Sequence, residues 1–173
     1  MRQDIAVFEY ADKILEGLRK GALLTTKADG KVNTMTISWG TLGIEWNKPI
    51  FTVFVRQSRY TKTLLDKSEA FTLSIPYGAY DKDILAYCGK HSGRDTDKIK
   101  TLGLHTQEGV SVDVPVIKEL ALILECKVIY RQMQESEAID KQCDALFYAK
   151  QTANEGDYHT AYYGEITAAY ILQ

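Results

Sequence analysis

The chain has 173 residues, of which 45% are hydrophobic and 25% charged, and its formal net charge is −2. This size and composition are typical of one ordinary globular domain, which we expect to span residues 1–173. The near-neutral charge gives no reason to expect nucleic acid or an anionic membrane as partner. No segment approaches the about 20 apolar residues that cross a bilayer, and the charged N-terminal segment lacks the apolar run of a signal peptide.

The cysteines argue against two classes of site. Cys88, Cys126 and Cys143 are odd in number and widely spaced, which fits neither a disulfide framework nor a paired zinc motif. We therefore expect no metal site. Reduced thiols favour a cytoplasmic location.

In chain order, the first predicted element is an amphipathic helix that ends at Gly21, because apolar residues recur at helical spacing between Phe8 and Leu18. The Asp-Gly pair at 29–30 is a hairpin-turn signal. The apolar run 50–55 indicates a buried strand. The predicted strands are 22–27, 32–39, 50–55, 70–75, 120–130 and 159–172; the predicted helices are 60–67 and 80–87; 88–97 is predicted as a polar loop, and 140–150 is compatible with helix or strand.

These elements predict a mainly β fold with added helices. Strands and helices do not alternate regularly, and the sequence contains neither G-x-G-x-x-G nor a Walker A motif, which argues against a Rossmann sheet or a P-loop. A barrel or a sandwich is favoured. The pattern alone does not say which barrel.

Four segments, in this order, carry a family resemblance. They are N-T-M-T-I-S-W-G at 33–40, K-P-I-F-T-V-F-V-R-Q-S-R-Y-T at 48–61, C-G-K-H-S-G-R-D at 88–95 followed by Lys98, and D-Y-H-T-A-Y-Y-G-E-I at 157–166. Together they resemble the flavin reductase-like family, an FMN-binding split β-barrel, and are most similar to its flavoredoxin-like branch. The resemblance covers nearly the whole chain and implies a homodimer with one FMN per subunit near the dimer interface.

Four residues with suitable side chains follow a predicted strand and open a predicted helix: Arg56, Ser58, Arg59 and Thr61. A helix N-terminus offers free N–H groups to a phosphate, and hydroxyl and guanidinium groups add hydrogen bonds. With the resemblance, these residues are expected to bind the FMN phosphate. The alternative is a plain helix cap, with Ser58 as the N-cap and both arginines in solvent. One arginine could also serve NAD(P)H or the dimer.

The predicted strand 32–39 carries threonine and serine on one face and apolar residues on the other. Taken alone, it would be an ordinary amphipathic strand. The resemblance implies a wall for the flavin ring, with hydroxyl donors at its edge. The cofactor-binding residues implied in this strand are Asn33, Met35, Thr36, Ile37, Ser38 and Trp39.

Two further regions are implied to reach the cofactor. Ser92, Arg94 and Lys98 could contact the flavin phosphate or the nicotinamide dinucleotide, the alternative being a solvated loop. His159 is the candidate catalytic residue, because the family places a histidine here on the nicotinamide side of the flavin. It could orient the reductant or deliver a proton; the alternative is a surface histidine at a strand start.

The resemblance implies an oxidoreductase in which NAD(P)H reduces bound FMN, which passes electrons to an acceptor. The cofactor carries such chemistry, so the lack of a catalytic triad or carboxylate pair is expected. The alternative is a flavoredoxin-like electron carrier reduced by a redox protein partner. A third possibility is a cofactor-storage or haem-handling relative on the same barrel.

Overall fold

The computed structural model describes residues 2–149 and 155–173. The chain forms ten strands, five α-helices and two short 3-10 helices within these residues. The strands are β1 Arg2–Asp4, β2 Ala22–Ala28, β3 Lys31–Ile37, β4 Gly40–Glu45, β5 Lys48–Arg56, β6 Ala70–Ile75, β7 Thr106–Gln107, β8 Val116–Ile117, β9 Leu122–Met133 and β10 His159–Leu172. The helices are η1 Val7–Tyr10, α1 Ala11–Lys20, α2 Tyr60–Ser68, α3 Lys82–Lys90, α4 Lys98–Leu102, η2 Ser136–Ala138 and α5 Lys141–Phe147.

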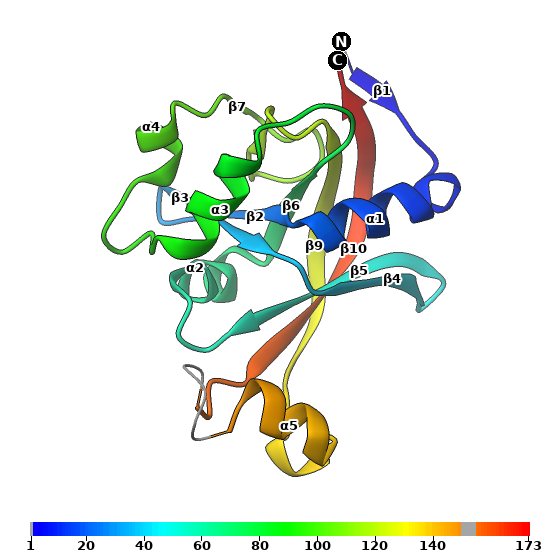
Figure 1. Cartoon of the computed structure of the whole chain (residues 1–173). Coiled ribbons are helices and arrows are strands. Elements are labelled where there is room, and N and C mark those ends of the chain that lie inside the picture. The colour runs from blue at the N-terminus through cyan, green and yellow to red at the C-terminus, as the bar shows by residue number, and fades with distance from the viewer. Residues whose placement is uncertain (1, 150–154) are drawn as a thin grey trace.

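One antiparallel sheet dominates the fold, with the strand order β3-β2-β6-β9-β10-β5-β4 and β1 added on β10. The long strands β9 and β10 run through its centre (Figure 1). β10 pairs with both β5 and β9, and its pairing with β9 is interrupted by two irregularities that let the ribbon bend. β3 and β4 follow each other in the chain but stand at opposite ends of the strand order, so the barrel is open between them.

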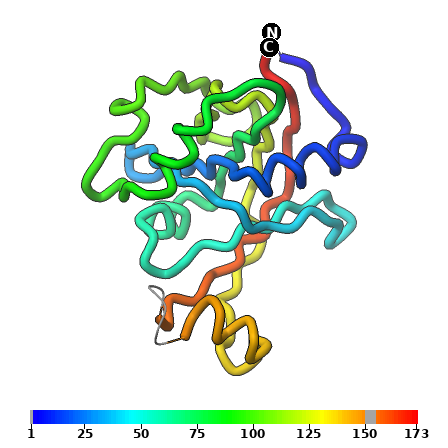
Figure 2. The backbone as a smooth tube through the Cα atoms, in the orientation of Figure 1, coloured from blue at the N-terminus to red at the C-terminus, as the bar shows by residue number. Residues whose placement is uncertain are grey.

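The helices lie on different parts of this sheet. α1 runs across it, α2, α3 and α4 gather on one side, and α5 lies at the far end of the β9–β10 ribbon (Figure 1). The backbone trace brings the two chain ends side by side, where β1 pairs with the end of β10 (Figure 2). The sheet and α1 therefore enclose the main core, whereas α5 stands apart from it.

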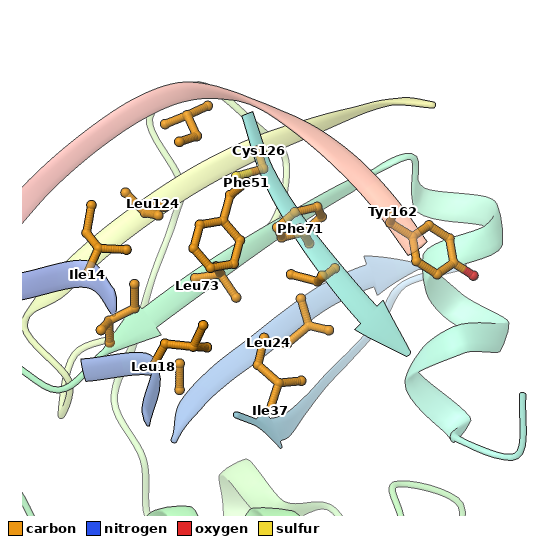
Figure 3. Packing of buried hydrophobic residues seen from close by; sticks show 14 of the residues in the cluster. Ile14, Leu18, Leu24, Ile37, Phe51, Phe71, Leu73, Leu124, Cys126 and Tyr162 are labelled. Carbon is orange, nitrogen blue, oxygen red and sulfur yellow. The ribbon is translucent and has the colours of Figure 1, made fainter. Parts of the chain in front are cut away.

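The main core is built from apolar side chains of α1, α2 and six strands. Figure 3 shows Ile14 and Leu18 of α1 facing aromatic residues of the sheet, among them Phe51 and Phe71. Both phenylalanines are fully buried, as is Tyr162 of β10. Burying a large apolar side chain contributes roughly 1.5–3 kcal/mol, so this cluster is the main source of stability for the split barrel.

Most predicted elements are confirmed, including the mainly β fold with added helices. The hairpin turn has positive φ at Asp29 (50°) and Gly30 (71°), as an Asp-Gly turn requires, and Gly21 ends α1 with φ 107°. The ambiguous segment 140–150 contains the helix α5, because the side chain of Asp140 accepts hydrogen bonds from two backbone N–H groups of its first turn. Lys150 lies outside the described residues.

Two expectations were wrong in their bounds, and one strand was missed. The strand predicted over 32–39 ends at Ile37, so Ser38 and Trp39 lie in the connection to β4. The loop predicted from residue 88 begins after Lys90, because α3 continues to that residue. β4 itself escaped prediction: it is a mostly exposed edge strand, and such strands lack the apolar alternation on which the prediction depends. None of the helices in the described ranges has the length and apolar character needed to span a membrane.

Gly164 of β10 lies where the sheet has no room for a side chain. A Cβ atom there would lie 2.6 Å from Cζ of Phe71 and 2.7 Å from Cβ of Cys126. We predict that Gly164→Ala lowers the free energy of unfolding by about 1–3 kcal/mol, because both neighbours are packed in the core. Gly43→Ala, at an edge-strand position with nothing within 4 Å, is the matched control. Urea denaturation of the two variants tests this, and equal unfolding midpoints would contradict it.

Candidate functional site

The residues singled out from the sequence converge on one cleft made of two adjoining cavities. The Trp39 cavity, of about 160 Å³, is lined by Met35, Thr36, Ile37, Ser38, Trp39, Phe54, Arg56, Arg59 and His159. The Lys98 cavity, of about 110 Å³, is lined by Asn33, Met35, Thr36, Ser58, Arg59, Tyr60, Thr61, Cys88, Gly89, His91, Ser92, Gly93, Arg94 and Lys98. The two cavities share Met35, Thr36 and Arg59. All fourteen predicted site residues therefore line the cleft.

The cleft continues into larger surface hollows. One of about 610 Å³ shares Asn33, Arg94 and Lys98 with the Lys98 cavity. Another of about 740 Å³ lies beyond Thr36 and Ser38. A ligand longer than either small cavity can therefore extend along the surface while part of it contacts the buried charged side chains of the cleft.

Lys98 is a buried cation at one end of the cleft. Its side chain is 3% exposed, and its Nζ donates a hydrogen bond to the carbonyl of His91 at 3.1 Å. Within the described ranges no carboxylate forms an ion pair with it. Burial lowers the pKa of Lys98, the nearby Cys88 thiol opposes this, and Arg59 lowers it further. A buried cation without a counter-ion is costly, so an anionic ligand would complete this end of the cleft.

The start of α2 supplies further donors beside Lys98. Thr61 is 1% exposed, and its Oγ1 accepts a hydrogen bond of 2.7 Å from Nδ2 of Asn33. Because this oxygen is the acceptor in that bond, the hydroxyl hydrogen of Thr61 remains available to a ligand. The first backbone N–H groups of α2 lie at the positive end of the helix, although that of Lys62 already donates to the Arg59 carbonyl at 3.0 Å.

Ser58 is held by an acidic residue. Asp157 accepts from the Ser58 backbone N–H at 2.9 Å and from its hydroxyl at 2.5 Å. The alternative role of Ser58 as N-cap is wrong: the cap position is Arg59, and its side chain makes no capping bond. Ser58 thus links the start of α2 to the chain just before β10.

The loop after α3 closes over the Lys98 cavity. At Gly93 a Cβ atom would lie 2.0 Å from Oδ1 of Asn33 and 2.8 Å from Cδ1 of Tyr60, so only glycine fits against β3 and α2. The Arg94 Nη1 donates to the carbonyl of Ser58 at 2.9 Å, and its guanidinium lies 5.6 Å from the ring centroid of Tyr60. Ser92 lines the cavity, as expected, but its Oγ accepts from the Arg94 N–H at 3.1 Å.

The other end of the cleft brings aromatic rings together with arginine and hydroxyl side chains. Trp39 is 42% exposed and makes an edge contact with Phe147 of α5, with ring centroids 5.0 Å apart. Thr36 donates its hydroxyl hydrogen to the Leu85 carbonyl at 2.6 Å. The side chain of Ile37 belongs to the main core. This end offers a flat aromatic edge and part-buried hydroxyl groups.

His159 is buried beside Trp39, with the two ring centroids 5.2 Å apart. Its Nδ1 lies 2.7 Å from the hydroxyl of Tyr148. Burial lowers the pKa of His159 to about 4, the cations Arg56 and Arg59 act in the same direction, and Asp157 opposes them. At neutral pH the imidazole is therefore uncharged, and the alternative of a surface histidine is wrong.

Several residues that line or adjoin the cleft escaped the sequence analysis. Phe54 lies in the mostly apolar run 50–55, where nothing in the pattern distinguishes it from core residues. Tyr60 and Gly93 lie within the motif segments and could have been predicted from them. Gln134 and Tyr148 contact His159 from the segment between β9 and β10, and no sequence signal points to them. His91, whose carbonyl holds Lys98, fell in the predicted loop. None of the described residues forms a group of three or more His, Cys, Asp or Glu that could hold a metal ion.

Comparison with known proteins decides the family. The flavin reductase like domain matches residues 19–172. The chain belongs to the flavin reductase-like family. This confirms the resemblance of the four sequence segments, and the family's similar solved structures confirm the predicted split barrel.

Two flavoredoxins are among the similar solved structures. Flavoredoxin of Desulfovibrio vulgaris (Miyazaki F) is 27% identical with a TM-score of 0.66, over 88% of this chain and 69% of that chain. Flavoredoxin from Methanosarcina acetivorans is 27% identical with a TM-score of 0.64, over 88% and 68% of the two chains. An uncharacterised protein of Archaeoglobus fulgidus is 32% identical over 99 residues, which are 57% of this chain and 55% of that protein. The match thus spans about half the length of that relative.

The lowered pKa of His159 predicts a pH dependence of stability in this family member. Between pH 6.5 and about pH 4 the unfolded state binds a proton that the folded state does not. The free energy of unfolding should therefore fall as the pH falls through this window, by at most about 1.4 kcal/mol per pH unit from this residue. Urea denaturation of wild type and His159→Asn over the window isolates the contribution. Parallel pH profiles for the two proteins would contradict the burial of a neutral imidazole.

Proposed function

We propose that this chain binds FMN in the cleft, with the phosphate in the Lys98 cavity and the flavin ring towards the Trp39 cavity, and acts as an NAD(P)H-dependent oxidoreductase. The observation that carries the proposal is the buried Lys98, which has no ion-pair partner in residues 2–149 and 155–173 and lies beside the start of α2. Flavoredoxins at 27% identity support a flavin as the ligand. The reduced state of buried Cys88 and Cys126 suits a cytoplasmic protein.

The donor set fits a phosphate monoester. Lys98 and Arg59 supply positive charge, Thr61 supplies a hydroxyl hydrogen, and the first N–H groups of α2 face an anion favourably. Charge-assisted hydrogen bonds of this kind are the stronger class in proteins. Neutralising the phosphate would also offset the cost of burying the Lys98 ammonium group.

FMN, when bound, supplies the redox chemistry: it takes up electrons from NAD(P)H and passes them to an acceptor. The chain's own residues then have simpler tasks. Trp39 and Phe147 form an apolar edge that limits water at the ring end, and Thr36 is fixed by its bond to the Leu85 carbonyl. The imidazole of His159 lines the same cavity and is uncharged at neutral pH.

Replacing the buried cation tests the phosphate site. We predict that Lys98→Met weakens FMN binding about tenfold to hundredfold, because a charge-assisted hydrogen bond contributes about 1.5–3 kcal/mol. Riboflavin, which lacks the phosphate, should bind wild type and variant alike. Isothermal titration of both ligands measures this.

The exposed Lys100 of the same helix provides the matched control, and Lys100→Met should leave FMN binding unchanged. The flavin-free Lys98→Met protein should be at least as stable as wild type, since an uncompensated buried charge is removed. Equal FMN affinities for wild type and Lys98→Met would refute the phosphate site.

The source of electrons is tested by anaerobic mixing with NADH or NADPH. Rapid loss of the oxidised-flavin absorbance supports a reductase, and His159→Ala should slow this step while FMN stays bound. The two flavoredoxins favour the second candidate, an electron carrier reduced by a protein partner. A flavin that stays oxidised until a reduced redox protein is added would establish the carrier instead.

We further propose a homodimer with the cleft near its interface. Large apolar side chains are exposed on the β4 hairpin and the outer end of β9, including Ile44 (70%), Trp46 (57%) and Met133 (59%). Trp39 and Phe147 are exposed beside the cleft. Apolar patches of this kind are typical of protein interfaces.

The dimer proposal predicts that Ile44→Glu with Trp46→Glu gives a monomer with weaker FMN binding. Phe8→Glu, which changes an exposed apolar residue on η1 (51%), is the control and should remain dimeric. Sedimentation equilibrium measures the mass. A wild-type protein that is monomeric at all concentrations would exclude the proposal.

A further inference from the structure

His159 is connected to two residues that the proposed chemistry has not used. Its Nδ1 lies 2.7 Å from the hydroxyl of Tyr148, which comes just after α5. Its backbone N–H donates to Oε1 of Gln134 at 3.0 Å, and the Tyr148 hydroxyl donates to the same oxygen at 3.1 Å. Tyr148 and His159 are each 5% exposed. These contacts form a closed hydrogen-bond network of the Gln134 amide oxygen, the Tyr148 hydroxyl, and the Nδ1 and backbone N–H of His159.

Which group donates in each of these hydrogen bonds follows from the hydrogen atoms that it carries. A backbone N–H can only donate, so it orients the Gln134 amide with its oxygen towards His159. The Tyr148 hydroxyl has a single hydrogen and gives it to that amide oxygen. The hydroxyl oxygen can then only accept at its 2.7 Å contact with the imidazole. A neutral His159 with its ring proton on Nδ1 satisfies all three contacts, because Nδ1–H then donates to the hydroxyl oxygen.

Resting on the proposed NAD(P)H-dependent function, we propose that Gln134 and Tyr148 are positioning residues that hold His159 as its Nδ1–H tautomer. Nε2 is then an acceptor on a side chain that lines the Trp39 cavity, suited to an amide N–H such as that of the nicotinamide carboxamide. His159 thus orients the reductant, and the other role considered from the sequence, delivering a proton, does not fit. Its Nδ1 proton is engaged by Tyr148, and Nε2 carries none.

The surrounding charges keep this arrangement at neutral pH. Arg56 and Arg59 disfavour a second proton on the ring, and Asp157 only partly opposes them. Arg56 is itself held over the Tyr148 ring, 5.0 Å from the centroid, and donates to the Asp157 carbonyl at 2.8 Å. Burial raises the pKa of Tyr148, so its hydroxyl stays protonated and able to donate.

Tyr148→Phe is the test, because it removes only the hydroxyl and keeps the ring beneath Arg56 and against Tyr158. The matched control is Tyr158→Phe: that ring stacks on Tyr148 at 4.7 Å, but its hydroxyl bonds to Asp144 and not to His159. Long-range ¹⁵N NMR of the imidazole in the FMN-loaded, oxidised protein reports the tautomer directly. We expect Nδ1–H in wild type and in Tyr158→Phe, and a mixture of tautomers in Tyr148→Phe.

Kinetic measurements show whether the Nε2 acceptor acts on NAD(P)H or on FMN. Tyr148→Phe should raise the KM for NAD(P)H about fivefold, as expected for the loss of one oriented hydrogen bond, with FMN affinity unchanged. A fall in FMN affinity instead would assign the acceptor to the flavin and overturn the carboxamide assignment. An Nε2–H or charged His159 in wild type at neutral pH, or an unchanged tautomer in Tyr148→Phe, would overturn the positioning role. If neither NADH nor NADPH reduces the wild-type protein, the proposed reductase function and the assignment of Nε2 to the nicotinamide carboxamide are both refuted. The tautomer of His159 is tested independently by NMR.

Discussion

The antiparallel pairing of β5 with β10 is the interaction on which the cleft depends. Its register sets His159 opposite Arg56, although the two residues are about a hundred positions apart in the chain. From this pairing follow the bonds of Asp157 to Ser58 and of Arg56 to the Asp157 carbonyl. The start of α2 and the start of β10 are thereby held together at the open side of the barrel. A slip of one residue would turn His159 to the opposite face of the sheet.

The cleft joins two ends with opposite physical character. At one end a cation is buried with no ion-pair partner among the described residues, and at the other a neutral imidazole lies beside aromatic rings and arginines. A buried cation is costly without an opposite charge, and a neutral imidazole with its proton on one ring nitrogen offers the other to a hydrogen-bond donor. An elongated ligand with a phosphate at one end and a flat heterocycle at the other would satisfy both. This complementarity links the family assignment to a particular place on the fold.

The sequence predicted most strands of the sheet, but not the edge strands β1 and β4, and with the family resemblance it predicted fourteen of the residues that line the cleft, because these features depend on local sequence. Strand 50–55 is recognisable from its own apolar run, and the donors at 56–61 from their place between a strand and a helix. Gln134 and Tyr148 could not be predicted, since their role exists only through contact with His159 across the β9–β10 connection. The role of Ser58 was also misjudged as a possible cap, because its partner Asp157 is distant in sequence.

The position of the cysteines has a practical consequence. Cys88 and Cys126 are buried, and burial raises the pKa of both thiols, whereas Cys143 is exposed on α5. A thiol-directed fluorophore would therefore attach at one position of the native protein. That position lies on the short helix whose Phe147 touches Trp39. Emission from such a label could follow ligand entry at the aromatic end in real time, with no change to Lys98 or His159.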